Sequence, residues 1–333
     1  MQKKLIALAV AGLVSGGAFA QSNVTLYGTY DAGIRNITNF NAAGQSVLRM
    51  NDPGNYNSNR FGLTGSEDMG GGLKARFRLE GDFQSGTGNQ GLAGGLWRRS
   101  AWVGLEGSMG SLDLGRQYTV IFKTIAAYDP FNYKYTGIIP TAGMDGARHD
   151  NEIQWGKKFG DVTLMASRAL GEVAGSTNNG AFTEAGGAWA NGPVNFGIAY
   201  GSGKNAAGTA TNSNWTLGGA YKAGPMRLAV GYDKKEIGAA VGSSTDTKWF
   251  WLGGSYDLGN AWELSAAAYD GKIDAPTAAA SGTNRLYIFG ATYAFSKRTN
   301  LYMDYDRRNL GGVARVGTLT NQNGMSLGIN HIF

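Results

Sequence analysis

The side chains best suited to chemistry in this sequence are arginines that recur at alternate positions. The odd positions of residues 73–83 are apolar or glycine, whereas the even positions are all charged: Lys74, Arg76, Arg78, Glu80 and Asp82. In an extended strand, successive side chains point to opposite faces. This segment therefore predicts a strand with one apolar face and one charged face. Because arginine stays protonated in proteins, its guanidinium groups can attract anions at any physiological pH.

The same parity argument assigns further arginines to the charged face. Phe61 and Leu63 would point to the apolar side, which turns Arg60 to the charged side. Equivalent alternation in the following segments assigns Arg98 and Arg148 to it, with Arg148 joined by Asp150 and Glu152. Arg60, Arg76, Arg78, Arg98 and Arg148 would thus line one wall. The alternative is that each arginine is simply a solvated or ion-paired side chain.

The sequence offers little for catalysis. It holds two histidines, His149 and His331, and no cysteine. A Ser–His dyad would have to use His149, and no spacing places an acid to orient it. A metal-binding cluster of histidine and cysteine is missing from the sequence. The glycines punctuate strands and turns and do not form a phosphate-binding loop at a helix start. We therefore predict no enzyme activity, no cofactor, no metal ion and no nucleic-acid partner.

The elements that would position these arginines are strands. Alternation of apolar with polar or small residues recurs at residues 194–200, 226–235 and 301–308, and seven short turns alternate with eight longer polar loops. Fifteen connections join sixteen strands. Short turns at one end and long loops at the other are typical of a transmembrane β-barrel. The chain is predicted to be all-β, a 16-stranded antiparallel transmembrane β-barrel. The soluble alternative, a β-sandwich or propeller, is disfavoured by aromatic residues near strand ends, where membrane interfaces need them.

Composition and the N-terminus agree with an exported chain. The 333 residues include 54 glycines, six prolines and 16% charged residues, with a net charge of +6. The sequence contains no run of about 20 apolar residues, so no membrane-spanning helix is predicted. Residues 1–20 resemble a signal peptide, because two lysines precede an apolar stretch that ends in Ala18-Phe19-Ala20. The remaining residues 21–333 would form a single barrel domain.

The chain end and several motifs point to one family. Phe333 is preceded on its own face by Met325, Leu327, Ile329 and His331, which resembles the assembly signal of Gram-negative outer-membrane proteins. Residues 24–28, 60–68, 101–105, 114–117, 148–151 and 328–333 resemble strands of the trimeric general porins of beta-proteobacteria, in the same order. One departure is Asn330, where this family often has a basic residue.

The longest connection, residues 119–147 (loop 3), is a candidate functional element. A loop of about 30 residues in a compact protein usually has a function. It contains the aromatic residues Phe122, Tyr128, Phe131, Tyr133 and Tyr135. The resemblance implies that loop 3 folds into the barrel and narrows it, with Asp129 and Asp145 facing the constriction. The alternative is an outward adhesive loop.

The sequence therefore predicts an outer-membrane general diffusion porin. It would pass small hydrophilic solutes and ions through a water-filled channel, with a preference for anions. The resemblance implies a homotrimer in contact with outer-membrane lipids and lipopolysaccharide. Two alternatives remain: a substrate-specific channel with the same barrel, and a plugged barrel that acts as an adhesin or enzyme.

Overall fold

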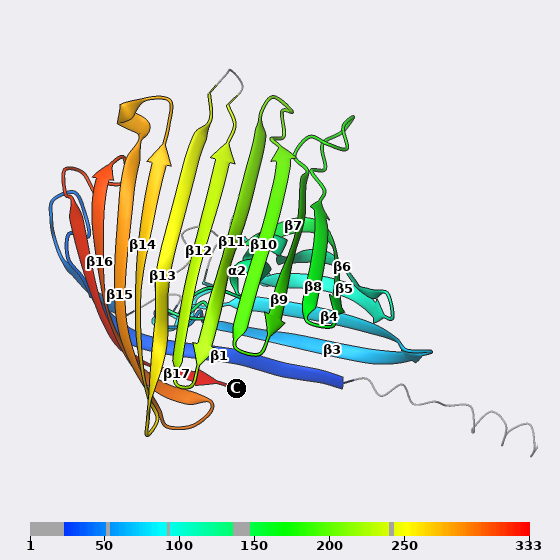
Figure 1. Cartoon of the computed structure of the whole chain (residues 1–333), viewed down its shortest axis with the longest axis horizontal. Helices are drawn as coiled ribbons and strands as arrows, with labels where there is room; N and C mark the ends of the chain where they lie inside the picture. The colour runs from blue at the N-terminus through cyan, green and yellow to red at the C-terminus, as the bar shows by residue number, and fades with distance from the viewer. Residues whose placement is uncertain (1–22, 51–53, 92–93, 136–146, 240–242) are drawn as a thin grey trace, which may run out of the picture.

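The computed structural model describes residues 23–50, 54–91, 94–135, 147–239 and 243–333. These residues form one antiparallel sheet of seventeen strands that closes on itself (Figure 1). The strands are β1 Asn23–Ile37, β2 Val47–Met50, β3 Arg60–Gly70, β4 Leu73–Asp82, β5 Ser100–Gly107, β6 Gly110–Tyr118, β7 Arg148–Phe159, β8 Val162–Ala169, β9 Phe182–Asn191, β10 Val194–Lys204, β11 Thr211–Ala223, β12 Met226–Ile237, β13 Thr245–Gly259, β14 Trp262–Asp274, β15 Gly282–Ala294, β16 Thr299–Gly312 and β17 Asn321–Ile332.

The seventeen strands make a wall of sixteen. β2 pairs with residues 34–37 of β1, and β3 pairs with residues 23–29 of the same strand on the same edge. They are therefore two halves of one barrel strand, interrupted by residues 51–59. This confirms the predicted 16-stranded antiparallel barrel. Each strand pairs with the next strand in the chain, because a turn or loop joins the two at one end of the barrel.

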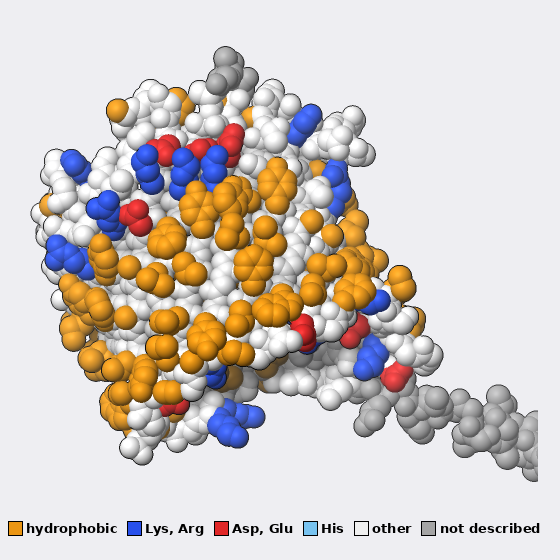
Figure 2. Space-filling model, viewed as in Figure 1, with side chains coloured by type: hydrophobic (Ala, Val, Ile, Leu, Met, Phe, Trp, Pro, Cys, Tyr) orange, Lys and Arg blue, Asp and Glu red, His pale blue; other side chains and the backbone are white. Residues whose placement is uncertain are grey.

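The outward face of the wall is apolar. In β10, Phe196, Ile198 and Tyr200 are exposed while the intervening Ala199 is buried, and β17 likewise exposes Met325, Leu327 and Ile329. Figure 2 shows apolar side chains as a broad band across this side of the barrel, with charged side chains gathered toward its upper and lower rims. A continuous band of this kind is stable only when lipid covers it.

Helical structure is minor in the described residues. α2, Val120–Ile125, begins at the Thr119 cap, whose hydroxyl accepts a hydrogen bond from Phe122 N. It lies inside the barrel against β8, β9, β10 and β11. η1, Ala278–Ala280, lies in an outer loop. No helix of the described residues has the length and apolar character needed to cross a membrane.

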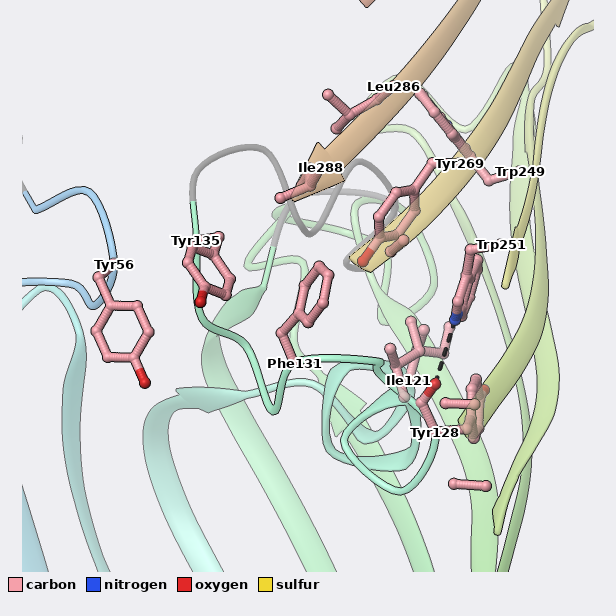
Figure 3. Packing of buried hydrophobic residues seen from close by; sticks show 14 of the residues in the cluster. Tyr56, Ile121, Tyr128, Phe131, Tyr135, Trp249, Trp251, Tyr269, Leu286 and Ile288 are labelled. Atoms are coloured by element: carbon pink, nitrogen blue, oxygen red, sulfur yellow. Dashed lines mark hydrogen bonds between the residues drawn. The ribbon is translucent and has the colours of Figure 1, made fainter. Parts of the chain in front are cut away.

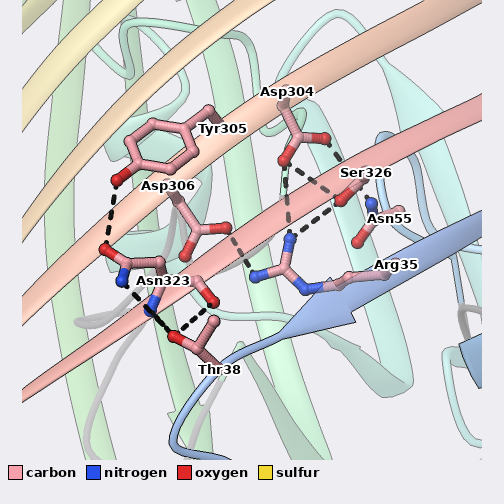
Figure 4. Close-up of polar contacts among 8 residues, drawn as sticks. All are labelled: Arg35, Thr38, Asn55, Asp304, Tyr305, Asp306, Asn323 and Ser326. Atoms are coloured by element: carbon pink, nitrogen blue, oxygen red, sulfur yellow. Dashed lines mark hydrogen bonds and ion pairs between the residues drawn. The ribbon is translucent and has the colours of Figure 1, made fainter. Parts of the chain in front are cut away.

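The barrel closes where β17 meets β1. Gly28 N donates to Phe333 O and Phe333 N donates to Gly28 O, so the last residue continues the backbone pairing. On the inner face, Arg35 reaches across β17 to Asp306 at 2.5 Å and Asp304 at 3.5 Å (Figure 4). All three side chains are buried, so losing one partner would leave an uncompensated charge.

Candidate functional site

The described part of loop 3, residues 119–135, enters the barrel and packs against the inner wall. Tyr128 is fully buried, and its hydroxyl hydrogen-bonds with Thr216 Oγ1 of β11 at 2.7 Å. Trp251 Nε1 of β13 donates to Tyr128 O at 3.2 Å (Figure 3). Arg227 of β12 donates to the carbonyl oxygens of Asp129 and Pro130. Three neighbouring strands thus hold the middle of the loop.

The inner wall beneath loop 3 has large aromatic residues and glycines that fit together. Trp249 and Trp251 point inward while Phe250 and Leu252 point outward, which sets the orientation of β13. At Gly218 of β11, a Cβ would overlap the Tyr128 ring, and at Gly290 of β15 it would overlap the Tyr135 ring. Only a residue without a side chain allows the loop to lie this close.

The acidic group predicted at the constriction is turned away from it. Asp129 is 2% exposed, and its carboxylate accepts hydrogen bonds from the backbone N–H groups of Phe131 and Tyr133. Burial raises the pKa of Asp129 to about 6, although those two hydrogen bonds oppose the shift. Asp129 therefore stabilises a turn within loop 3. Asp145 lies outside the described residues.

A second inserted segment meets the far part of loop 3. Asp31 of β1 accepts hydrogen bonds from the backbone N–H groups of Tyr56 and Asn57, which holds residues 54–59 inside the barrel. Tyr56 O accepts from Tyr135 N, and the two rings lie edge to face at 5.1 Å. Figure 3 shows Tyr56, Tyr135 and Phe131 in sequence across the lumen. The two loops therefore form a continuous ridge along one side.

The predicted arginines lie opposite, on β3, β4 and β7. Arg60, the first residue of β3, donates to Asn57 Oδ1 at 3.2 Å. Arg76 pairs with Asp113 at 2.6 Å and Glu106 at 2.9 Å and lies over the Trp102 ring. Arg78 lies 5.4 Å from the Tyr27 ring centroid. These three arginines lie on the same wall of β3 and β4.

The placement of Arg98 on this wall is corrected by the structure. Parity was counted back from Ser100, but the strand begins only there, and a bend at Arg99 breaks the alternation. Arg99 is buried instead, with its Nε 2.7 Å from Glu80 Oε1 and an Nη 2.9 Å from the Tyr118 hydroxyl. Arg98 lies beside Gly94 in the preceding loop.

A bulge near the start of β7 changes a second prediction. The β6–β7 register shifts between Gly115 and Gln117, and Asn151 has a φ of 52°. Asp150 is consequently exposed and pairs with Arg116, whereas His149 is buried and points inward. Glu152 faces inward as predicted. The extra residue in the bulge puts Asp150 on the outer face and His149 on the inner face.

Arg148 reaches the lumen from the end of β7. Its guanidinium donates to the Tyr118 hydroxyl at 2.6 Å and lies 4.1 Å from the centroid of that ring. The Tyr118 ring stacks on Phe122 at 4.5 Å, and Phe122 stacks on Tyr133. A line of aromatic rings thus joins the arginine wall to loop 3.

Loop 3 contributes lysines that sequence reasoning did not single out. Lys123 and Arg76 both line two cavities of about 450 and 470 Å³ at the short-turn end of the barrel. Lys134 donates to the Tyr56 hydroxyl at 3.2 Å. Burial lowers the pKa of both lysines, and nearby arginines lower it further. Neither residue follows an alternating pattern, because both lie in a loop.

The residues of the assembly signal lie at the closing edge. Phe333 packs against Gly28, where a Cβ would overlap its ring. His331 is exposed, and its Nδ1 hydrogen-bonds with Thr299 Oγ1 at 2.9 Å. Both residues therefore lie on the outside of the barrel, away from the lumen.

Comparisons with known proteins agree with this geometry. Outer membrane porin protein 32 of Delftia acidovorans is 32% identical, with both chains covered in full. An outer membrane porin protein of Bordetella pertussis is 31% identical over 91% of this chain and 93% of its own. The solved structure titled anion-selective porin from Comamonas acidovorans is similar with a TM-score of 0.80 and 25% identity, covering 94% of this chain and 100% of that one.

The match to the Gram-negative porin family covers residues 7–312. A closed barrel of sixteen strands is too wide for its side chains to fill and leaves an aqueous channel, which loop 3 and the segment at Tyr56 narrow. The chain belongs to the Gram-negative porin family and is an outer-membrane diffusion channel for small hydrophilic solutes.

Proposed function

We propose that this porin prefers anions, because guanidinium groups opposite loop 3 form no ion pair with a carboxylate of the described residues. Glu80 is paired with Arg99, and Asp113 is paired with Arg76. Among the described residues, by contrast, no carboxylate forms an ion pair with Arg60, Arg78 or Arg148. This excess of positive charge is the observation on which the proposal rests.

Loop 3 adds to the same imbalance. Lys123 and Lys134 lie on the lumen side of the loop, while the Asp129 carboxylate is held by its own backbone. Fixed charges act over roughly 8–10 Å at physiological salt, so those around a narrow opening influence every passing ion. The description of one similar structure as an anion-selective porin supports this direction.

The test is the zero-current potential of the purified porin in a planar bilayer under a potassium chloride gradient. We expect the sign for chloride preference, decreasing as salt is raised. Replacing Arg60, Arg78 and Arg148 together with glutamine should shift the potential toward potassium. A matched triple variant at Arg285, Arg298 and Arg307, on the outer surface and in a short turn, should leave the potential unchanged. A potassium preference in the wild-type channel would contradict the proposal.

We further propose a homotrimer, which is supported by the resemblance to trimeric porins. Ala32 faces outward on β1 and allows close packing of a neighbouring subunit, whereas Gly33 faces the lumen beside Tyr302. Cross-linking of the purified porin should give a trimer. A monomer under conditions that keep the barrel folded would contradict this part.

We also propose contact with the phosphates of lipopolysaccharide at the long-loop end. Lys234, Lys248 and Lys272 are direct cross-strand neighbours on the outward face of β12, β13 and β14. Figure 2 shows a row of charged side chains above the apolar band. Neighbouring like charges repel, and Asp246 and Asp274 relieve this only in part. Replacing the three lysines with glutamine should reduce the lipopolysaccharide that copurifies.

A further inference from the structure

Three ionisable side chains converge in the wall beneath the start of loop 3. His149 and Glu152 belong to β7, and Glu184 belongs to β9 two strands away. His149 is 4% exposed and each glutamate is 1% exposed. One ligand atom from each lies within 4.8 Å of the others, and His149 Nδ1 is 4.0 Å from Glu184 Oε2. The cluster plays no part in the cationic wall described above.

Hydrogen bonds hold each carboxylate by one of its oxygens. Gln154 Nε2 donates to Glu152 Oε1 at 3.0 Å. Glu184 Oε2 accepts from Val120 N of loop 3 at 2.8 Å and from Ser167 Oγ at 3.2 Å. Donors that fix a carboxylate in this way are typical of the residues surrounding a metal site, because they orient the ligands.

The second oxygen of each carboxylate is left without a well-placed donor. Glu152 Oε2 and Glu184 Oε1 are buried and accept no hydrogen bond of good geometry from the described residues, although the Ser167 hydroxyl lies close to Glu152 and the Ile121 N–H lies close to Glu184. Nor does any described lysine or arginine form an ion pair with either group, since Lys123 donates to Gln154 Oε1 instead. A buried carboxylate oxygen without a partner is costly. A cation inside the cluster would offset this cost.

We propose that His149, Glu152 and Glu184 bind a divalent transition-metal cation of the zinc type. An imidazole nitrogen and two carboxylate oxygens form a common ligand set for such ions, with remaining positions taken by water. Tetrahedral ligand bonds of about 2.0–2.2 Å place the ligand atoms about 3.4 Å from each other. The three ligand atoms lie within 4.8 Å of one another, so on binding they would approach by at most about 1.4 Å.

The bound cation would join the wall to the constriction. Glu184 holds the first backbone N–H of α2, so a cation on its other oxygen fixes β7, β9 and the start of loop 3 together. This site goes beyond the proposed anion preference, because it lies under loop 3 and not on the arginine wall. The two proposals can therefore fail independently.

The test is zinc binding by the purified full-length porin after removal of metals with a chelator. We expect one zinc ion per chain after dialysis, measured by elemental mass spectrometry, and a titration by calorimetry. His149→Gln and Glu152→Gln should each weaken zinc binding at least tenfold. His331→Gln is the matched control, since it removes the other histidine, which is exposed, and it should bind zinc as the wild type does.

X-ray absorption of the zinc-loaded wild type keeps the test independent of whether the variants fold. We expect one imidazole nitrogen together with oxygen ligands. Absence of retained zinc, equal binding by all variants, or a spectrum without imidazole would each overturn the proposal. In the last two cases the zinc would be bound adventitiously at the surface.

Discussion

The two sides of the barrel follow the same alternation but use their inward positions differently. On β3 and β4 these positions carry charged side chains such as Arg60, Arg76 and Arg78. On β11, β13 and β15 they carry glycine and tryptophan, such as Gly218, Trp251 and Gly290. The first side faces water and the second is covered by loop 3. Strand parity decides which residues point inward, and contact with water or with loop 3 decides which residue types occupy those positions.

The difference has an energetic reason. A charged side chain beneath loop 3 loses its hydration, which costs several kcal/mol unless donors compensate it. Glu184 is accordingly held there by Val120 N and Ser167 Oγ. Conversely, a glycine or tryptophan on the open side would supply no charge to the channel. The side opposite loop 3 therefore sets ion preference, and the side beneath it sets the width of the opening.

Removing loop 3 should have the largest effect, because it erases the difference between the two sides. Replacing residues 120–146 with a short glycine–serine linker should raise single-channel conductance by about twofold or more, since an unobstructed sixteen-stranded barrel holds a wide aqueous channel. Larger sugars should then enter proteoliposomes in a swelling assay. Shortening the outer loop at residues 171–180 is the control and should change neither property. Unchanged conductance without loop 3 would show that another segment limits the channel.

The charged side can be tested by comparing two neighbouring arginines. Arg99→Gln leaves Glu80 buried without its ion-pair partner, which should cost about 3–5 kcal/mol and shift selectivity toward cations. Arg98→Gln removes the same charge from the adjacent loop and should change both properties less. Thermal unfolding and the zero-current potential measure the two effects. Equal effects of the two variants would contradict the placement of Arg99 on the inner wall.

The docking of loop 3 on the covered side can be tested with a substitution that adds one methyl group to the inner wall. Gly218→Ala places a Cβ in the space of the Tyr128 ring and should destabilise the docked loop by about 1–3 kcal/mol. At Gly156 of β7, a Cβ would meet Met165 at 3.7 Å, an ordinary contact, so Gly156→Ala is the matched control. Limited proteolysis of loop 3 measures the change. Equal cleavage of the two variants would contradict docking at Gly218.

The smallest expected effect concerns Asp129. Its pKa of about 6 in the folded loop lies above its usual value of 3.8, so the folded state binds the proton more tightly. The contribution of this group to stability therefore rises as pH falls from 7 to about 4, by an amount on the order of 2 kcal/mol. Asp129→Asn should lack this rise, measured as the pH dependence of thermal unfolding relative to the wild type. Parallel pH profiles would show that Asp129 is solvated.

The sequence by itself determined the barrel and its lipid-facing side, and it predicted an arginine wall. Period-two alternation is a local property of an extended chain, so Arg60, Arg76 and Arg78 could be assigned from their neighbours alone. The aromatic content of loop 3 likewise distinguished it from a solvated loop. These inferences succeeded because each depends on adjacent residues.

The tertiary structure decided what alternation cannot encode. A bend at Arg99 and a bulge at Asn151 each interrupt the alternation, and both depend on pairing with a neighbouring strand. Asp129 turned into its own loop because backbone donors were available there. Glu184 came beside His149 only through two intervening strand pairings. Contacts between distant segments are governed by register and loop docking, which no local pattern in the chain specifies.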